Sequence, residues 1–553
     1  MKKFLTTVLT VFIFLGILAG AAAGFYLYRK YAPSKELADQ SEWFGVSGDE
    51  VAVLLDHELV EAVKGRYMDG EVYLPLSWVN DELNERFYWD DKEKQLIYTL
   101  PESIVYADAG TLGNDGKPLL FEQDGEVWLK TGLILTYTDV RIERYVDDEV
   151  KRVFVGTSWE PIHVAKAEKK GELRVRGGVK SDILTQLEPE QPLEILDTME
   201  KWSKVKTETG YIGYVQNKIL GDIAECEQIS TFDAPVYTNI AMNEPVCMVW
   251  HQVMTADANG VMERLIGNTK GVNVIAPTWF MLTANDGSYE SLAEQSYVTK
   301  AHNLGMQVWA VLDNFNKGSE VQSEILFADS AARKKLIANL MKDVEKYGID
   351  GINLDIEGIK PAAGPHYIQF IRELSVDCRK NGIVLSVDSY VPSAYTSFYN
   401  RAEQGRVADY VIIMGYDEHY AGGEAGSVAS LEYERKGIED TLKEVPAQKV
   451  ISAIPFYTRL WKVDESGETT STAMGIAKAA AWVEENGMEL YWQDELGQYY
   501  GEKQMADGMY YLWMEEERSI GLKADLIRKN GLAGVACWKL GFEPAEIWDI
   551  VKP

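Results

Sequence analysis

The second half of the chain alternates short apolar segments with amphipathic helical patterns, from residue 241 to residue 553. Eight apolar segments separated by helices are what a closed parallel barrel requires. An open doubly wound sheet would usually carry a glycine-rich phosphate loop, and none is seen here. We therefore expect an α/β fold over these residues, a (β/α)8 TIM barrel. Its expected strands are Val246–His251, Val272–Thr278, Gln307–Asp313, Gly351–Glu357, Val384–Asp388, Tyr410–Tyr416, Val450–Pro455 and Gly534–Trp538.

The fourth expected strand carries polar residues at alternate positions. Asn353, Asp355 and Glu357 are separated by Leu354 and Ile356. Side chains two apart share a face, and polar residues at the carboxyl end of a barrel strand reach the active-site mouth. Two neighbouring carboxylates couple their titrations, so that one keeps a proton near neutral pH, as a general acid must. The alternative is a pair of loop carboxylates that bind a cation or face water, but polar residues inside a barrel strand are costly unless used.

This strand reads Asp350-x-x-Asn353-x-Asp355-x-Glu357, and with one substitution it resembles the signature of glycoside hydrolase family 18, the chitinase-like family. Further motifs of the resemblance fall on the expected strands. Met414-Gly-Tyr416-Asp417 ends the sixth, Ile454–Trp461 the seventh, and Trp538 the eighth. The resemblance covers the whole expected barrel. In Gln307–Asn314 the chain is also similar to the branch of the family that cuts spore-cortex and wall peptidoglycan.

The resemblance implies a substrate-assisted mechanism with no cofactor and no metal. Glu357 would protonate the glycosidic oxygen, and the sugar's own 2-acetamido carbonyl would attack the anomeric carbon. Asp355 would orient the acetamido nitrogen, while the Tyr416 hydroxyl would steady the carbonyl oxygen. Trp538 would form an apolar floor under the sugar ring, although Tyr416 and Trp538 also fit ordinary barrel packing. The further substrate-binding residues that we expect are Met414, Asp417, Trp279, Arg459 and Asp388.

Asn353 is the substitution, because the family pattern has Asp at this position. An Asp there can share a proton with the middle Asp as catalysis proceeds. Asn353 can donate a hydrogen bond to Asp355 but cannot take its charge. We therefore expect Asp355 to be more firmly ionised and the pH optimum to change, with Glu357 still present as the acid.

Residues 44–165 contain short strands with acidic turns. Gly70–Leu76 followed by Tyr88–Tyr98 is echoed by Gly125–Lys130 followed by Tyr145–Phe154. Apolar residues alternate on either side of Asp-Asp turns, which is typical of hairpins. The repeat predicts a duplicated αβ or β module. It resembles the small stalk module at the amino end of copper amine oxidases, and we interpret it as a spacer.

Residues 172–222 contain short alternating strands joined by turns, which is typical of a small β-barrel. They resemble the bacterial Src-homology-3-like domain, which in many wall hydrolases helps to hold peptidoglycan. Both wall binding and a structural spacer packed on its neighbour fit this fold.

An almost unbroken apolar run over residues 4–28 follows Lys2 and Lys3. As a helix it is long enough to cross the hydrocarbon core of a bilayer. Ala21-Ala22-Ala23 also fits the cleavage site of a signal peptide. We expect a transmembrane signal anchor in the cell membrane with the catalytic domain outside, and a secreted protein after signal cleavage as the alternative.

The formal net charge of −31 argues against binding to nucleic acid, which needs clustered Lys and Arg. The four cysteines have no metal-like spacing. The expected partner is an N-acetylated glycan, and the anchor and the Src-homology-3-like domain favour peptidoglycan. Three alternatives stay open: a chitinase, an endoglycosidase acting on N-linked glycans, and a catalytically silent carbohydrate-binding protein of the envelope.

Overall fold

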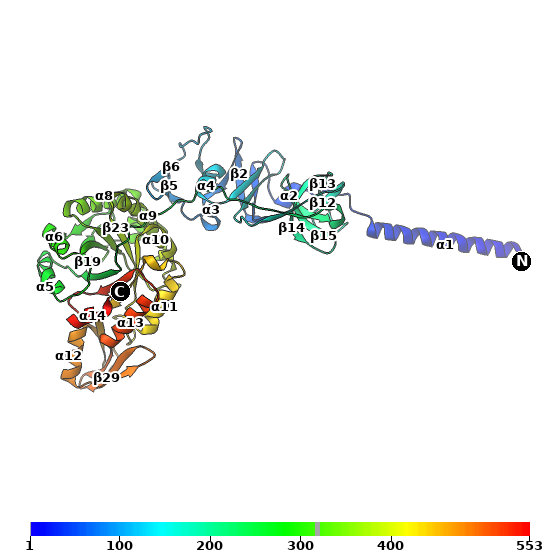
Figure 1. Cartoon of the computed structure of the whole chain (residues 1–553). Coiled ribbons are helices and arrows are strands. Elements are labelled where there is room, and N and C mark those ends of the chain that lie inside the picture. Colours follow the sequence, from blue (N-terminus) through cyan, green and yellow to red (C-terminus); the bar gives the residue numbers. More distant parts are fainter. Residues whose placement is uncertain (1, 316–320, 553) are drawn as a thin grey trace. The chain divides into compact units, whose positions relative to one another are not determined.

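The computed structural model describes residues 2–315 and 321–552 (Figure 1). It begins with helix α1 (Lys2–Tyr31), which is long and apolar enough to cross a membrane over Lys3–Tyr31 and is exposed along its length. The chain forms two compact units. One contains residues 1–87 and 107–234, and the other contains residues 88–106 and 235–553.

The first unit contains a seven-stranded sheet in the order β7-β8-β3-β2-β1-β10-β9. The two segments that look alike in sequence each form a strand that leads into a short helix. β3 (Glu71–Pro75) continues into α3 (Leu76–Glu82), and β8 (Glu126–Lys130) continues into α4 (Thr131–Tyr137). β3 and β8 pair with each other, antiparallel. The other strands are β1 (Glu50–Leu55), β2 (Glu58–Met68), β7 (Leu120–Gln123), β9 (Arg141–Tyr145) and β10 (Lys151–Gly156).

A second seven-stranded sheet of the same unit has the order β13-β12-β16-β15-β14-β11-β17. Every strand pair recorded in this sheet is antiparallel. Its strands are β11 (Ile162–Lys166), β12 (Gly171–Arg174), β13 (Ile183–Leu187), β14 (Pro192–Thr198), β15 (Trp202–Thr207), β16 (Ile212–Gln216) and β17 (Ala224–Cys226).

These two sheets share one hydrophobic core. Leu54 and Phe154 of the first sheet belong to the same buried cluster as Leu173 and Val215 of the second, together with Phe44 of the short helix α2 (Gln40–Phe44). Burying one common apolar surface makes the two sheets mutually dependent for stability.

Eight parallel strands of the second unit close into a barrel, as expected. β18 pairs with β31 on one side and with β19 on the other, and this pairing closes the sheet. Four of the expected strands have the bounds that the sequence indicated. The strands are β18 (Val246–His251), β19 (Val274–Leu282), β21 (Gln307–Asp313), β22 (Gly351–Asp355), β23 (Val384–Tyr390), β24 (Tyr410–Met414), β25 (Val450–Pro455) and β31 (Gly534–Trp538), with β20 (Tyr289–Ser291) added antiparallel to β19.

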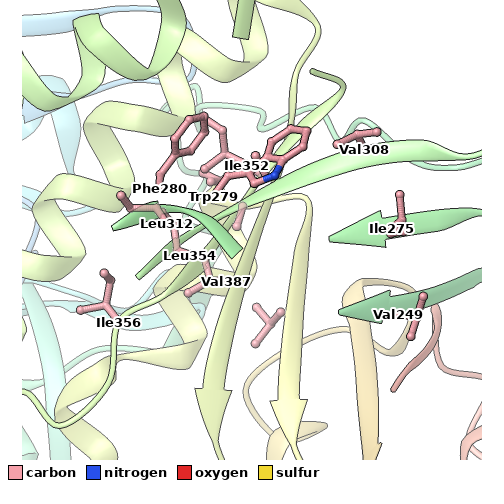
Figure 2. Packing of buried hydrophobic residues seen from close by; sticks show 14 of the residues in the cluster. Val249, Ile275, Trp279, Phe280, Val308, Leu312, Ile352, Leu354, Ile356 and Val387 are labelled. Carbon is pink, nitrogen blue, oxygen red and sulfur yellow. The ribbon is translucent and has the colours of Figure 1, made fainter. Parts of the chain in front are cut away.

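Alternate residues of the barrel strands pack into two separate cores. Val249 and Val308 lie in one cluster (Figure 2). This cluster also contains apolar residues of the surrounding helices. Their chain neighbours Trp250 and Trp309 lie in a different cluster, inside the barrel. This separation is the direct result of the two-residue period of a β-strand.

The helices that cover the barrel bury one apolar face each. α8 (Ser330–Tyr347) is capped by the Asp329 carboxylate and ends at Gly348 in the left-handed conformation. On the same helix, Met341 is only partly buried. The other α-helices that surround the barrel are α5 (Met262–Ile266), α6 (Gln295–Asn303), α7 (Ser323–Leu326), α9 (Gly364–Asn381), α10 (Arg401–Val407), α11 (Leu431–Thr441), α13 (Glu517–Lys529) and α14 (Trp548–Val551).

An additional five-stranded sheet lies in the chain between β25 and α13, in the order β27-β26-β30-β29-β28. The buried pair of Lys523 on α13 and Glu515, 2.8 Å apart, joins this insertion to the barrel. The insertion consists of β26 (Tyr457–Val463), β27 (Thr469–Gly475), α12 (Ile476–Asn486), β28 (Leu490–Gln493), β29 (Gln498–Met505) and β30 (Gly508–Met514).

A small three-stranded sheet made of β4 (Tyr88–Asp90), β5 (Gln95–Thr99) and β6 (Ile104–Ala107) packs on helices of the barrel. The Tyr88 hydroxyl lies 2.7 Å from Nδ1 of His366 on α9. These contacts explain why residues 88–106 belong to the same compact unit as the barrel.

Candidate active site

Strand β22 places its polar residues inside the barrel. Ile352 and Leu354 belong to the outer core, while Asn353 is fully buried and Asp355 is 7% exposed. The strand ends at Asp355 rather than at Glu357. Glu357 therefore follows the strand, at the carboxyl end of the barrel where active sites of this fold are built.

The side chain of Asn314 holds the backbone of Glu357 from both sides. The amide N–H of Glu357 donates to Oδ1 of Asn314 at 3.0 Å, and Nδ2 of Asn314 donates to the carbonyl oxygen of Glu357 at 2.8 Å. Asn314 follows β21, the neighbouring strand. A side chain therefore replaces the backbone ladder at the point where β22 has ended.

The carboxylate of Glu357 is bound by a tyrosine. The hydroxyl of Tyr390, the last residue of β23, donates to Oε2 of Glu357 at 2.7 Å and accepts the N–H of Gly358 at 3.1 Å. Burial raises the pKa of Glu357, and the Tyr390 hydrogen bond opposes that rise. A carboxyl group with a raised pKa can hold a proton at the pH where it has to donate it.

Further carboxylates surround Glu357. Burial raises the pKa of Asp355 well above its usual range, and the charges of Asp388, Glu357 and Asp313 add to the rise. Burial also raises the pKa of Asp313 to about 6. Asp355 and Glu357 lie close enough for the charge of Glu357 to raise the pKa of Asp355, so the protonation of one affects the other. Burial therefore favours the protonated form of Asp355 in this chain, and the effect of Asn in place of Asp at position 353 stays a prediction.

Asn353 makes other hydrogen bonds than the sequence indicated. Its Nδ2 donates to Oδ1 of Asp388 at 2.8 Å and to the Ser386 hydroxyl at 3.0 Å, and its Oδ1 accepts from Nε1 of Trp250 at 2.9 Å. The expected bond to Asp355 is replaced, because Ser386 is the register partner of Asn353 on the neighbouring strand β23.

A pocket of about 380 Å³ opens over Asp355 and Glu357. Four of the other residues singled out in the sequence line it, namely Trp279, Tyr416, Asp417 and Trp538. Carboxylates and aromatic rings together are the usual lining of a sugar-binding cleft, since rings cover the apolar face of a pyranose and carboxylates accept from its polar groups.

The remaining substrate-binding candidates lie outside this lining. Met414 is buried at the end of β24, and Asp388 lies behind the pocket against Asn353. Arg459 approaches Asp417, with its guanidinium 3.3 Å from the carboxylate. Asp417 is also held by the Tyr457 hydroxyl at 2.6 Å, so Tyr457 and Arg459 together orient it.

Asn314, Tyr390 and Asp313 contact or face Glu357 but were not assigned a role from the sequence. All three lie at or directly after the carboxyl end of a barrel strand, a position that marks candidates in this fold. Over residues 2–315 and 321–552, no group of three or more His, Cys, Asp or Glu has an arrangement suited to a metal ion. All four cysteines are free, and Cys226 is exposed.

The closed parallel barrel and the acidic, aromatic pocket at the carboxyl ends of its strands define the class of protein, a (β/α)8-barrel glycoside hydrolase. The family model described as glycosyl hydrolases family 18 matches residues 282–543, and the model described as bacterial SH3 domain matches residues 171–220. The chain therefore contains a glycoside hydrolase family 18 domain and a bacterial SH3 domain.

Two similar proteins come from bacilli. The chain is 27% identical over 295 residues to an uncharacterized glycosylase, YvbX, of Bacillus subtilis (strain 168). The alignment covers 51% of this chain and 84% of the relative. It is 23% identical over 310 residues to the cortical fragment-lytic enzyme of Bacillus anthracis. That alignment covers 53% of this chain and 71% of the relative.

Among solved structures, the spore cortex-lytic enzyme SleL of Bacillus cereus superposes with a TM-score of 0.51 at 20% identity. The match covers 59% of this chain and 76% of that chain. At this level of identity the superposition shows the common barrel fold.

Proposed function

We propose that the protein is a membrane-anchored glycosidase that cleaves the β-1,4 bond after N-acetylglucosamine in peptidoglycan. The observation that carries the proposal is the neighbouring pair of buried carboxyl groups, Asp355 and Glu357, both with raised pKa, at the floor of an aromatic pocket. The raised pKa of Glu357 suits a proton donor. The cortical fragment-lytic enzyme among the similar proteins favours a glycan of the bacterial envelope.

In the proposed reaction the substrate supplies its own nucleophile. Glu357 gives its proton to the glycosidic oxygen while the bond between that oxygen and C1 breaks. The 2-acetamido carbonyl oxygen forms a bond to C1 and closes an oxazolinium ring. Asp355 accepts the acetamido N–H and balances its positive charge, and Tyr416 donates to the carbonyl oxygen.

Water completes the cycle. The carboxylate of Glu357 takes a proton from a water molecule whose oxygen attacks C1 and opens the ring. Two successive displacements at C1 leave its configuration retained, and Glu357 is protonated again. Trp538 lies on the pocket wall, where its ring would support the sugar.

The test uses the full-length chain, purified in detergent and incubated with isolated sacculi. Mass spectrometry of the products should find N-acetylglucosamine at the new reducing ends. The Glu357→Gln variant should lose activity by a factor of about 10² to 10⁴, the usual contribution of a general acid. Glu485→Gln, an exposed residue on α12, is the matched control and should cleave normally.

Three outcomes would contradict the proposal. Reducing ends with N-acetylmuramic acid would place the cut at the other bond. Cleavage of chitin oligomers or N-linked glycans without cleavage of sacculi would identify a different substrate. Binding without turnover by the wild type, equalled by Glu357→Gln, would identify a silent carbohydrate-binding protein.

We infer that α1 anchors the chain in the cell membrane and that the catalytic unit lies outside. The length and hydropathy of α1 support this, as does its exposure. Fractionation of cells followed by amino-terminal sequencing tests it. An intact amino terminus in the membrane fraction is expected, whereas a mature chain that begins after Ala23 and is found in the medium would show a cleaved signal peptide.

We infer that residues 44–222 act as a spacer. The resemblance of residues 44–165 to the copper amine oxidase stalk concerns their shape and implies no copper chemistry. The common core of the two sheets supports this, as does buried Arg152, whose guanidinium lies 4.1 Å from the ring centroid of Tyr211. Sacculus pull-down by the full-length Glu357→Gln variant should be unchanged by Tyr214→Ala, a change in the cleft beside α2. Lost binding would assign wall recognition to this region.

A further inference from the structure

The orientation of the Asn353 side chain is determined by its neighbours. The indole N–H of Trp250 is a donor only, so the amide oxygen of Asn353 has to face it. The amide NH2 group then points the other way, toward Asp388 and Ser386 on β23. Asn353 is completely buried, and this leaves it a single hydrogen-bonding arrangement.

Asp388 and Asn353 are chemically complementary. Asp388 is only 3% exposed, and its Oδ1 accepts from Asn353 at 2.8 Å. With an Asp at position 353, one oxygen would accept from Trp250 and the other would face the Asp388 carboxylate with no hydrogen between them. The carboxylate that the family signature has on β22 is therefore replaced by one on the adjacent strand β23.

Asp388 also lies beside Asp355. Leu354 and Val387 are register partners, and Asp355 and Asp388 follow them on the two parallel strands. Burial raises the pKa of both carboxyls, but the Asn353 hydrogen bond opposes the rise at Asp388. Oδ1 of Asp355 is buried without a hydrogen-bond partner. When the two groups lose one proton, Asp388 therefore takes the negative charge.

We propose that Asp388 is a positioning residue whose buried negative charge, held by Asn353, keeps a proton on the Asp355–Glu357 pair. That proton is the one Glu357 gives to the glycosidic oxygen, so this inference rests on the proposed function. Asp388 itself neither gives nor receives the proton. It acts by electrostatic attraction alone, which is strong inside a barrel where water does not screen it.

Other titratable groups face Asp388 from each side. Asp355 and Glu357 belong to β22 and the turn after it, Tyr416 follows β24, and Tyr367 lies on α9. The pKa of each tyrosine is raised by burial, so both stay neutral over the range of interest. The carboxylates are thus the groups that determine the response of the site to pH.

The test compares pH profiles of kcat/KM for the full-length chain on a fluorogenic aryl glycoside of an N-acetylglucosamine disaccharide. Asp388→Asn removes the charge but keeps an acceptor for Asn353. Asn353→Leu removes the donor, so that Asp388 becomes protonated and neutral. In both variants the basic limb should move to lower pH by about one unit, with kcat reduced and KM nearly unchanged.

The double variant Asn353→Asp, Asp388→Asn returns one carboxylate to β22. The basic limb of its kcat/KM profile should return to the wild-type pH. Ser386→Ala removes a neutral partner of Asn353 and should leave the basic limb at the wild-type pH. A wild-type limb in Asp388→Asn, or no rescue in the double variant, would overturn the inference. A purely structural Asp388 would lower the melting temperature without moving the limb.

A second measurement does not depend on turnover. Infrared titration of the protonated carboxyl band should show that Asp388→Asn loses the remaining buried carboxyl proton at lower pH than the wild type. An unchanged titration would reject the inference. If the wild type cleaves neither the aryl glycoside nor sacculi, the proposed function fails, and the infrared result still decides the role of Asp388.

Discussion

The hydroxyl of Tyr390 donates a hydrogen bond to Oε2 of Glu357 at 2.7 Å, although the two residues are 33 positions apart in the chain. This contact stabilises the charged form of Glu357, whereas burial stabilises the protonated form. The balance between the two decides the pH at which Glu357 can act as an acid.

Removing that hydroxyl should raise the pKa of Glu357. In Tyr390→Phe the charged carboxylate loses a hydrogen bond of about 1.5 to 3 kcal/mol, and 1.36 kcal/mol corresponds to one pKa unit. The basic limb of kcat/KM should therefore move to higher pH by about one unit, opposite to the shift in Asp388→Asn. Tyr399→Phe is the control, because its hydroxyl faces the carbonyl oxygen of Ile356 instead. Equal profiles for both tyrosine variants would contradict the prediction.

Asn314 should matter for the position of Glu357 rather than for its charge. Asn314→Ala removes both hydrogen bonds to the Glu357 backbone. Because displacement of a reacting group by about 1 Å can cost on the order of a hundredfold in rate, kcat should fall by about tenfold or more while KM changes little. Steady-state kinetics measures this, and a change in KM alone would show that Asn314 serves substrate binding instead.

The two pocket tryptophans should respond differently to truncation. Trp538 is partly exposed in the pocket, so Trp538→Ala should raise KM by about tenfold through loss of an aromatic contact of about 1.5 kcal/mol. Trp279 is 1% exposed and donates to Asn259 at 2.9 Å. Trp279→Ala should instead destabilise the barrel by about 3 to 5 kcal/mol. Kinetics and thermal denaturation of both variants distinguish these effects, and similar results for the two would contradict the prediction.

Glu434 should make the barrel less stable as the pH rises. Burial raises its pKa from 4.5 to about 7, despite a hydrogen bond from Ser452. Because the folded pKa is the higher one, its favourable contribution is complete below about pH 4.5 and is lost as the pH passes 7. Glu434→Gln should therefore gain stability over the wild type above pH 7, on the order of 3 kcal/mol, and little at pH 4.

The contrasting variant is Glu403→Gln, in which the buried guanidinium of Arg372 loses its ion pair with the Glu403 carboxylate, 2.7 Å away. That variant should be destabilised at neutral pH, because a buried guanidinium loses an ion pair with a carboxylate. Denaturant unfolding at several pH values measures both variants. If the free energy of unfolding of Glu434→Gln changed with pH in parallel with that of the wild type, ionisation of Glu434 would cost the folded state nothing, and the prediction would be wrong.

Much of the architecture was predictable because it depends on local periodicity. The eight barrel strands follow from short apolar segments between amphipathic helices, and the ends of Val246–His251, Gln307–Asp313, Val450–Pro455 and Gly534–Trp538 agree with the structure. Errors occur where a partner from elsewhere in the chain intervenes. β22 ends two residues early because the side chain of Asn314 takes over the hydrogen bonds of Glu357.

The sequence by itself determined the barrel and the placement of Asn353 and Asp355 on its inner face, whereas the end of the strand before Glu357 came from the structure. The barrel and this placement depend on the two-residue period of one strand and on the chain order of strands and helices. Only the tertiary structure decided that Asn353 binds Asp388 and not Asp355, and that Tyr390 binds Glu357. Hydrogen bonds between neighbouring parallel strands join residues more than 30 positions apart, and their directions depend on register and burial, which no local pattern specifies.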